Sequence, residues 1–192
     1  MPVIDAFLLS FGVIFLAELG DKSQLMALAF AARFPALPVL VAITLATALV
    51  HLFSVALGAT VALALPASLI SIVAGLAFLV FAAWTLRGDR LDEREDEKVR
   101  RAAGSVMLTV GTAFFLAELG DKTMLATVTL ATHEDALGTW LGSTVGMVVA
   151  DAIAIGVGKV LGTRLPERAI RLGATVAFVV FGLILIWEGL HS

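Results

Sequence analysis

The 192-residue sequence contains no cysteine, no tyrosine and no asparagine. The absence of cysteine excludes disulfides and thiolate metal sites. Hydrophobic residues make up 60% of the chain, whereas about half would be usual for a soluble domain. The net charge of -3 carries little information, because most charges balance within one segment in the middle of the chain. The composition therefore favours a membrane protein without covalent cross-links.

Charged residues are also scarce in six long stretches of the chain. Apolar runs of about 18 residues or more are typical of transmembrane helices. The runs are 6–32, 37–65, 68–86, 106–132, 137–161 and 170–190. No basic segment or small-residue cleavage site precedes the first run, so we expect a span there and not a signal peptide. The sequence predicts an all-α integral membrane protein with six transmembrane helices.

The second half of the chain repeats the first half at an offset of 100 residues, without gaps. For example, Gly58 matches Gly158, and Leu65–Pro66 matches Leu165–Pro166. We therefore expect one three-helix repeat at 1–86, a charged linker at 87–104 and a second repeat at 105–192. Because three is an odd number of spans, the second repeat must be inverted, and inverted repeats are typical of transporters.

Lysine and arginine are confined to one side of this six-span arrangement, apart from Lys22 and Lys122. That side holds Arg33, the six basic residues of 87–101, Lys159, Arg164, Arg168 and Arg171. By the positive-inside rule it is cytoplasmic, which places both termini outside. The segment 87–101 also holds six acidic residues. We interpret it as a hydrophilic tether between the repeats, with a regulatory role as the alternative.

One eight-residue stretch occurs in both repeats, each time in the middle of an apolar run. Phe15–Lys22 and Phe115–Lys122 both read FLAELGDK, and a hydroxyl residue follows each, Ser23 or Thr123. A charge at that depth is costly and normally functional. As one helix, the run 6–32 would be about 40 Å long against a hydrocarbon core of about 30 Å. It must tilt, kink or unwind, and the natural hinges are the motif glycines, Gly20 and Gly120.

The acidic residues of the two copies are the candidate metal ligands: Glu18, Asp21, Glu118 and Asp121. On a continuous helix the two acids of each copy share a face, and each lysine follows its glutamate at a spacing that favours an ion pair. If the copies meet, four carboxylates in a low-dielectric cleft cannot all stay ionised. Lys22 and Lys122 leave two negative charges, which one divalent cation or two protons would compensate. The motifs therefore indicate a site that holds a metal ion and protons in turn.

The predicted ligand set is all oxygen once the hydroxyls of Ser23 and Thr123 are included. Such sets suit Mg²⁺, Ca²⁺ and Mn²⁺, and Zn²⁺ or Cu⁺ are less favoured because only His51 among the histidines lies in a span. At the matching position of the second repeat stands Asp151. This pair either handles protons or adds a ligand, or it serves only as hydrogen-bonded polar residues in the helix packing.

Two Glu-Leu-Gly-Asp-Lys-Ser/Thr motifs in a six-span chain resemble the Gdt-type family of cation/proton antiporters. That family includes Golgi manganese/calcium transporters and bacterial and chloroplast manganese exporters. The likeness covers essentially the whole chain, and both copies fit the pattern. It implies that Mn²⁺ or Ca²⁺ is exported against protons through the four motif carboxylates, in a bacterial inner membrane. We expect no catalytic residue, no cofactor and no nucleic-acid partner, and homo-oligomerisation is left open.

Other interpretations use the same charges. They could form only buried ion pairs within each copy, although such pairs stabilise poorly. The motif could lie in a loop, but Leu25–Ala32 is too short to span alone. A metalloenzyme would need a nucleophile or an activated water, and no His-rich cluster or Ser/Lys dyad supports one. A passive channel with an acidic ring is the main alternative, but the lysines beside the acids favour a gated, saturable site.

The topology is testable with single cysteines, because the chain has no background thiol. In intact cells, we expect Ser192→Cys to react with an impermeant thiol reagent and Asp92→Cys to stay unlabelled. Cell lysis should make Asp92→Cys reactive, which controls for access. Labelling of Asp92→Cys but not of Ser192→Cys in intact cells would reverse the assigned orientation.

Overall fold

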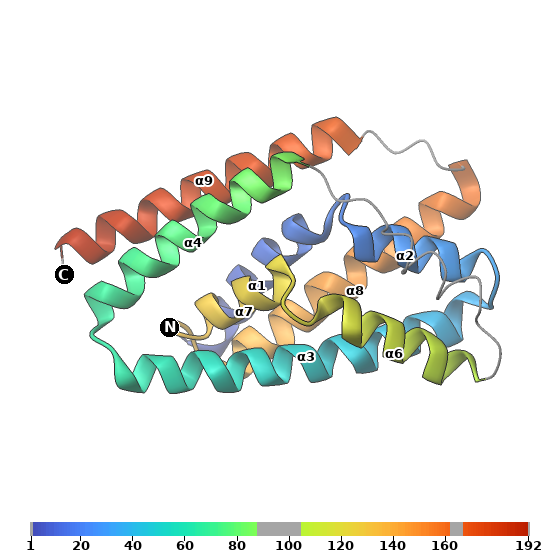
Figure 1. Cartoon of the computed structure of the whole chain (residues 1–192), viewed down its shortest axis with the longest axis horizontal. Coiled ribbons are helices and arrows are strands. Elements are labelled where there is room, and N and C mark those ends of the chain that lie inside the picture. The colour runs from blue at the N-terminus through green and yellow to red at the C-terminus, as the bar shows by residue number, and fades with distance from the viewer. Residues whose placement is uncertain (1, 88–104, 162–166, 192) are drawn as a thin grey trace.

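The computed structural model describes residues 2–87, 105–161 and 167–191, and these ranges are entirely helical apart from short connections. The first half holds α1 (Val3–Glu18), α2 (Lys22–Ala31), α3 (Ala36–Ala64) and α4 (Ala67–Arg87). The second half holds α6 (Val106–Glu118), α7 (Lys122–Leu130), α8 (Ala136–Leu161) and α9 (Glu167–His191) (Figure 1). The predicted linker after Arg87 and the label sites Asp92 and Ser192 lie outside the described residues.

The predicted all-helical membrane fold is confirmed at the level of its apolar helices. Among the described residues, α3, Ser68–Leu86 in α4 and Ala136–Gly156 in α8 are long and apolar enough to cross a membrane. The bent pair α1–α2 would make a fourth span. Large hydrophobic side chains such as Leu63 and Val80 are exposed, as lipid contact requires. These helices are consistent with an integral membrane protein.

Both motif-bearing runs are broken at the predicted hinge glycines. α1 and α2 meet at an angle of 75°, and α7 follows α6 after a break of the same length. Gly20 and Gly120 have φ angles of 77° and 80°, in the left-handed region that glycine adopts without steric cost. The expectation that the two acids of a copy share one helix face was therefore wrong. Each of these helices ends at its glutamate, and the aspartate occupies the N-cap position of the next helix without a capping side-chain hydrogen bond.

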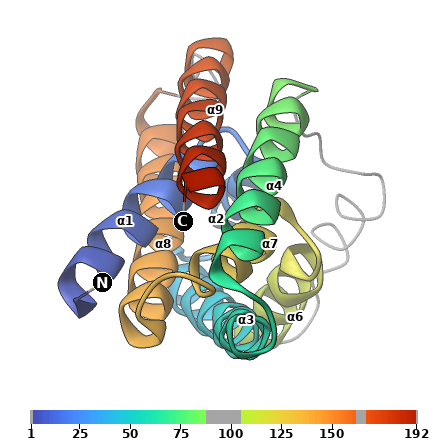
Figure 2. The same cartoon turned by 90° about the vertical axis from the view of Figure 1, so that its left-hand side faces the viewer.

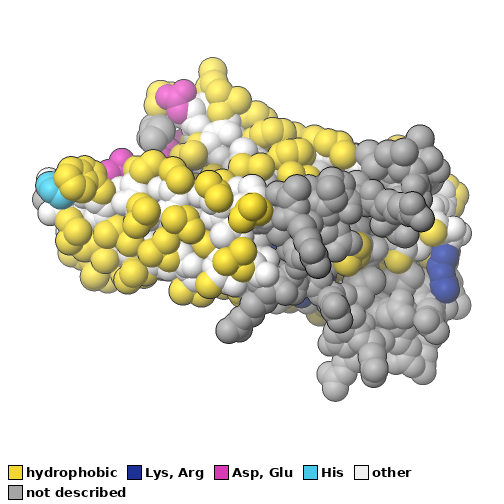
Figure 3. Space-filling view, turned by 90° about the horizontal axis from the view of Figure 1, so that it is seen from above, with side chains coloured by type: hydrophobic (Ala, Val, Ile, Leu, Met, Phe, Trp, Pro, Cys, Tyr) yellow, Lys and Arg dark blue, Asp and Glu magenta, His cyan; other side chains and the backbone are white. Residues whose placement is uncertain are grey.

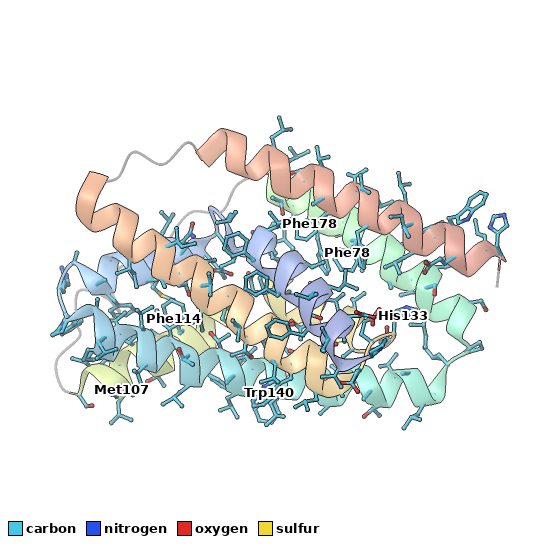
Figure 4. All side chains as sticks on the ribbon, turned by 180° about the vertical axis from the view of Figure 1, so that it is seen from behind. Phe78, Met107, Phe114, His133, Trp140 and Phe178 are labelled. Atoms are coloured by element: carbon cyan, nitrogen blue, oxygen red, sulfur yellow. The ribbon has the colours of Figure 1, made fainter. Side chains whose placement is uncertain are left out.

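The helices form two groups. α4 and α9 pack along each other and stand at one side of the other six helices (Figures 1 and 2). Their contact is aromatic: the rings of Phe78 and Phe178, which have the same position in the two repeats, lie 5.8 Å apart (Figure 4). Phe78 also contacts Phe181, and Phe81 contacts Phe178 in return. Such exchanged contacts are expected when equivalent elements meet around a two-fold axis.

The backbones of α1 and α8 pack closely, because glycines of α8 face α1. A β-carbon added to Gly146 would lie 2.7 Å from the carbonyl oxygen of Phe11. Along α1, the first residue that Gly138 contacts is Val3, and the first that Gly142 contacts is Phe7. Four residues along α8 thus correspond to four residues along α1, so the two helices run in the same direction and in fixed register.

The surface separates charge from apolar side chains. On the face seen in Figure 3, Asp and Glu gather at one end, and a patch of Lys and Arg lies at the opposite end. Hydrophobic side chains cover much of the described surface between these ends. This distribution suits a protein with two aqueous ends and an apolar middle.

The close α1–α8 packing predicts opposite effects for two glycine substitutions in the same helix. Gly146→Ala should destabilise the protein by about 1–3 kcal/mol, because the added methyl group overlaps α1 backbone. Gly156→Ala, with nothing within 4 Å of its β-carbon, should be neutral or stabilising by up to roughly 1 kcal/mol. Thermal unfolding of the two detergent-solubilised variants measures both effects. Equal melting temperatures would show that this packing contributes nothing.

Candidate functional site

Each helix break brings one carboxylate from the end of a helix next to another at the start of the following helix. The backbone N–H of Asp21 donates to the carbonyl of Glu18 at 3.0 Å. The second copy has the same turn, with Asp121 and Glu118 at 3.2 Å. All four carboxylates are buried, with at most 4% of any of these residues exposed. The two motifs therefore place four acidic groups out of contact with water.

The aspartate of each copy is paired with the lysine of the other copy. Lys122 Nζ lies 2.7 Å from Asp21 Oδ1, and Lys22 Nζ lies 3.4 Å from Asp121 Oδ1. The structure thus brings together four of the predicted site residues from opposite repeats. Pairing within a copy was predicted from a continuous helix, and the break removes the spacing on which that prediction rests.

The glutamates of the two copies are held by the predicted hydroxyl residues. Ser23 Oγ donates to Glu18 Oε1, and Thr123 Oγ1 donates to Glu118 Oε2 at 2.7 Å. The second oxygen of each glutamate, Oε2 of Glu18 and Oε1 of Glu118, is buried without a hydrogen-bond partner. A buried carboxylate oxygen in that state is costly and invites a cation or a proton.

The two halves of the site differ in exposure. The side chain of Lys122 is 3% exposed, whereas that of Lys22 is 24% exposed. Gly120 is exposed and Gly20 is half-buried. Gly120 and the Lys22–Asp121 pair therefore lie nearer the surface than Gly20 and the Lys122–Asp21 pair do.

Asp151 and His51, which occupy matching positions, lie in different surroundings. Asp151 is fully buried, and neither carboxylate oxygen has a hydrogen-bond partner. Its charge interacts with those of Glu18 and Glu118. His51 is also buried, but its Nδ1 lies 3.4 Å from the hydroxyl of Thr144. The structure therefore associates Asp151 with the motif glutamates and His51 with α8.

Gln24 belongs to the site as well, although the sequence analysis did not select it. Its Oε1 accepts a hydrogen bond from Gly20 N–H at 2.8 Å, and its Nε2 donates to the carbonyl of Ala150 at 3.1 Å. It thereby ties the first hinge to the turn of α8 that carries Asp151. At the matching position, Met124 Sδ lies 3.1 Å from Gly120 N. The sequence contained one signal for this residue: Gln24 is the one glutamine in the chain, and the matching position of the second repeat holds a methionine.

The site is rich in oxygen ligands but is not arranged as a closed metal cage. Within the described residues, no three His, Asp or Glu side chains are placed to hold one metal ion. The aspartates are occupied by lysines, and each glutamate has one oxygen on a hydroxyl. A cation that binds here must use the unpartnered oxygens or displace a lysine. The hollow of about 410 Å³ between α1 and α9 is lined by apolar side chains and holds none of these residues.

Comparison with known proteins finds one family model, "Divalent cation/proton antiporter GDT1", which matches residues 6–93 and 106–192. A Vibrio cholerae protein named "Putative manganese exporter" is 35% identical over 94% of this chain and 90% of its own length. A GDT1-like protein of Synechocystis is 29% identical over 96% of this chain and 98% of its own. The chloroplast protein PAM71 of Arabidopsis thaliana is 30% identical over 97% of this chain and 58% of its own. No solved structure matches the chain.

The two cross-repeat ion pairs should differ in their effect on stability. Lys122→Met leaves Asp21 buried without its 2.7 Å partner, and we expect a loss of about 3–5 kcal/mol. Lys22→Met also leaves a buried aspartate without its partner, but the longer contact and the partly exposed lysine predict a smaller loss than for Lys122→Met. Thermal unfolding in detergent tests this order.

A second substitution controls for the origin of the loss. Asp21→Asn in the Lys122→Met background should restore most of the lost stability, because it removes the uncompensated charge. If the double variant is as unstable as Lys122→Met alone, the ion pair is not the cause.

Proposed function

Because the chain belongs to the GDT1 family of divalent cation/proton antiporters, we propose that it is a secondary transporter that exports Mn²⁺ from the cytoplasm in exchange for protons. The resemblance drawn from the two motifs is thereby confirmed at the level of the family. The family consists of transporters and not of enzymes. Manganese as the cargo is proposed from the name of the Vibrio cholerae relative and from the oxygen ligands, and Ca²⁺ is a second candidate.

The observation that carries this proposal is the buried meeting of the two motifs. Glu18 and Glu118 each keep one unpartnered oxygen, while Asp21 and Asp121 are held by lysines of the opposite copy. Four carboxylates and two lysines leave two negative charges. One Mn²⁺ or two protons compensate both charges of the motifs, and the nearby Asp151, when it is ionised, requires a third positive charge. Because a ligand must lose its proton to bind a metal, the two cargoes compete for the same oxygens.

The proposed architecture is six spans in two inverted repeats, 1–86 and 105–192, joined by the segment 87–104. The family match in two segments, 6–93 and 106–192, supports the division. The exchanged contacts of equivalent residues in the motifs and in α4–α9 support a two-fold relation between the repeats. In this arrangement each broken helix, α1–α2 or α6–α7, counts as one span whose hinge lies near the membrane midplane.

The proposed location is a bacterial inner membrane, with both termini outside and the segment 87–104 in the cytoplasm. The bias in lysine and arginine supports this orientation. Arg33 follows α2 in the loop before α3 and lies on the proposed cytoplasmic side, whereas the acidic pair Glu134–Asp135 precedes α8 on the other. Export then means that Mn²⁺ enters from the basic side and protons enter from the other.

A passive channel remains the alternative, and one observation separates the two. The lysines close the site with direct ion pairs to Asp21 and Asp121. A channel needs a continuous path, whereas a transporter needs a site that is occluded between steps. The buried pair Lys122–Asp21, with residues only 3% and 0% exposed, favours the transporter.

Exchange in proteoliposomes tests the proposal. We expect Mn²⁺ uptake to depend on an outward proton gradient, and Glu18→Gln or Glu118→Gln to reduce it by at least about tenfold. Glu188→Gln, on the exposed face of α9, should transport at the wild-type rate. Uptake that is unaffected by collapse of the proton gradient would identify a channel. Wild-type rates in both motif variants would exclude these glutamates as the site.

A further inference from the structure

We propose that Asp151 is a direct ligand of the transported cation and completes a three-carboxylate set with Glu18 and Glu118. This inference rests on the proposed function and names a residue outside the duplicated motif. The three side chains come from three different helices, α1, α6 and α8. In the first repeat His51 stands at the corresponding position, so the binding site is not two-fold symmetric.

The register of α1 and α8 places Asp151 beside Glu18. Gly142 contacts Phe7 and Phe11, and Gly146 contacts Phe11 and Phe15. Position 150 is four residues further along α8. By the same spacing it lies next to the last turn of α1, which holds Glu18. The hydrogen bond from Gln24 to the Ala150 carbonyl fixes the same turn of α8 against the start of α2. Asp151 is therefore held at the break by backbone packing.

The three carboxylates hold four of the five carboxylate oxygens of the site that are buried without a hydrogen-bond partner. Both oxygens of Asp151, Oε2 of Glu18 and Oε1 of Glu118 are buried without a hydrogen-bond partner. Asp151 is 0% exposed, so it cannot turn to water. Asp21 and Asp121 each bind a lysine through Oδ1, and Oδ2 of Asp121 is also buried without a hydrogen-bond partner. These four oxygens do not yet surround one point, but they are of the kind that a hard divalent cation binds.

Without a cation, like charges oppose the gathering of the three groups into a cage. The charge of Asp151 acts on both Glu18 and Glu118, and like charges in a low-dielectric interior repel strongly. A divalent cation removes this repulsion and draws the carboxylates together. The lysines can then remain paired with their aspartates, so cation binding does not require the cross-repeat ion pairs to break.

A cysteine at position 151 tests direct ligation, because the chain has no other thiol. A thiolate prefers Cd²⁺ to Mn²⁺. We expect purified Asp151→Cys to bind Mn²⁺ at least about tenfold more weakly than wild type and Cd²⁺ at least about tenfold more tightly, by calorimetry. Bound Cd²⁺ should also give a thiolate-to-metal charge-transfer band. Ser143→Cys, buried in the same helix about 12 Å away, should keep wild-type affinities and show no band.

Asp151→Asn is the second variant, because it keeps the shape of the side chain and should fold if the cysteine variant does not. It should also weaken Mn²⁺ binding by about tenfold or more. If Glu18→Gln abolishes Mn²⁺ binding while both Asp151 variants bind like wild type, this inference fails and the proposed function stands. If the wild-type protein binds no Mn²⁺, both fail. Cd²⁺ binding by Asp151→Cys without the charge-transfer band would also overturn direct ligation.

Discussion

The fold depends on the exchange of counter-charges between the two repeats. Each motif buries an aspartate whose lysine partner belongs to the other motif, at 2.7 Å for Asp21 and Lys122 and 3.4 Å for Asp121 and Lys22. An isolated repeat would bury an aspartate without this partner, and an uncompensated charge costs several kcal/mol in an apolar interior. The helix breaks make this exchange possible, because in a continuous helix each lysine would lie beyond the point where the two motifs meet. The hinge glycines therefore serve the assembly of the two halves as much as the shape of each half.

Most of the helical fold could be predicted from the sequence, because it depends on the length and hydrophobicity of the apolar runs. Run length and hydrophobicity identified the apolar helices, and the constant offset between the halves identified the repeat. The hinges followed from a length argument, since the run 6–32 is too long for one straight span, and φ angles near 80° at Gly20 and Gly120 confirm them. The motif itself was visible as the charge that apolar runs of this kind normally lack.

The partners of the motif side chains were beyond the sequence, because they depend on the angle between helices. Lys22 stands four residues after Glu18, which predicts a pair only if the helix continues. The break at Gly20 turns Lys22 toward Asp121, a residue 99 positions away. The bridge made by Gln24 from Gly20 to Ala150 is likewise tertiary, so no local pattern distinguishes it from a glutamine in ordinary packing. The roles of these side chains depend on their neighbours in the folded protein, which sequence spacing alone does not give.

The differences between the repeats are as informative as their identity. Two copies of one motif around a two-fold axis can exchange conformations, and a transporter with inverted repeats uses such an exchange to open its site to each side in turn. If all neighbours were also identical, the two states would have equal free energy. They are not identical: Gln24 corresponds to Met124, and His51 corresponds to Asp151, at an offset of 100 residues. Only states that interact differently with these side chains can differ in population. In the proposed mechanism the duplicated motif supplies two states, and residues that differ between the halves, such as Gln24 and Asp151, determine which state is favoured and where the cation binds.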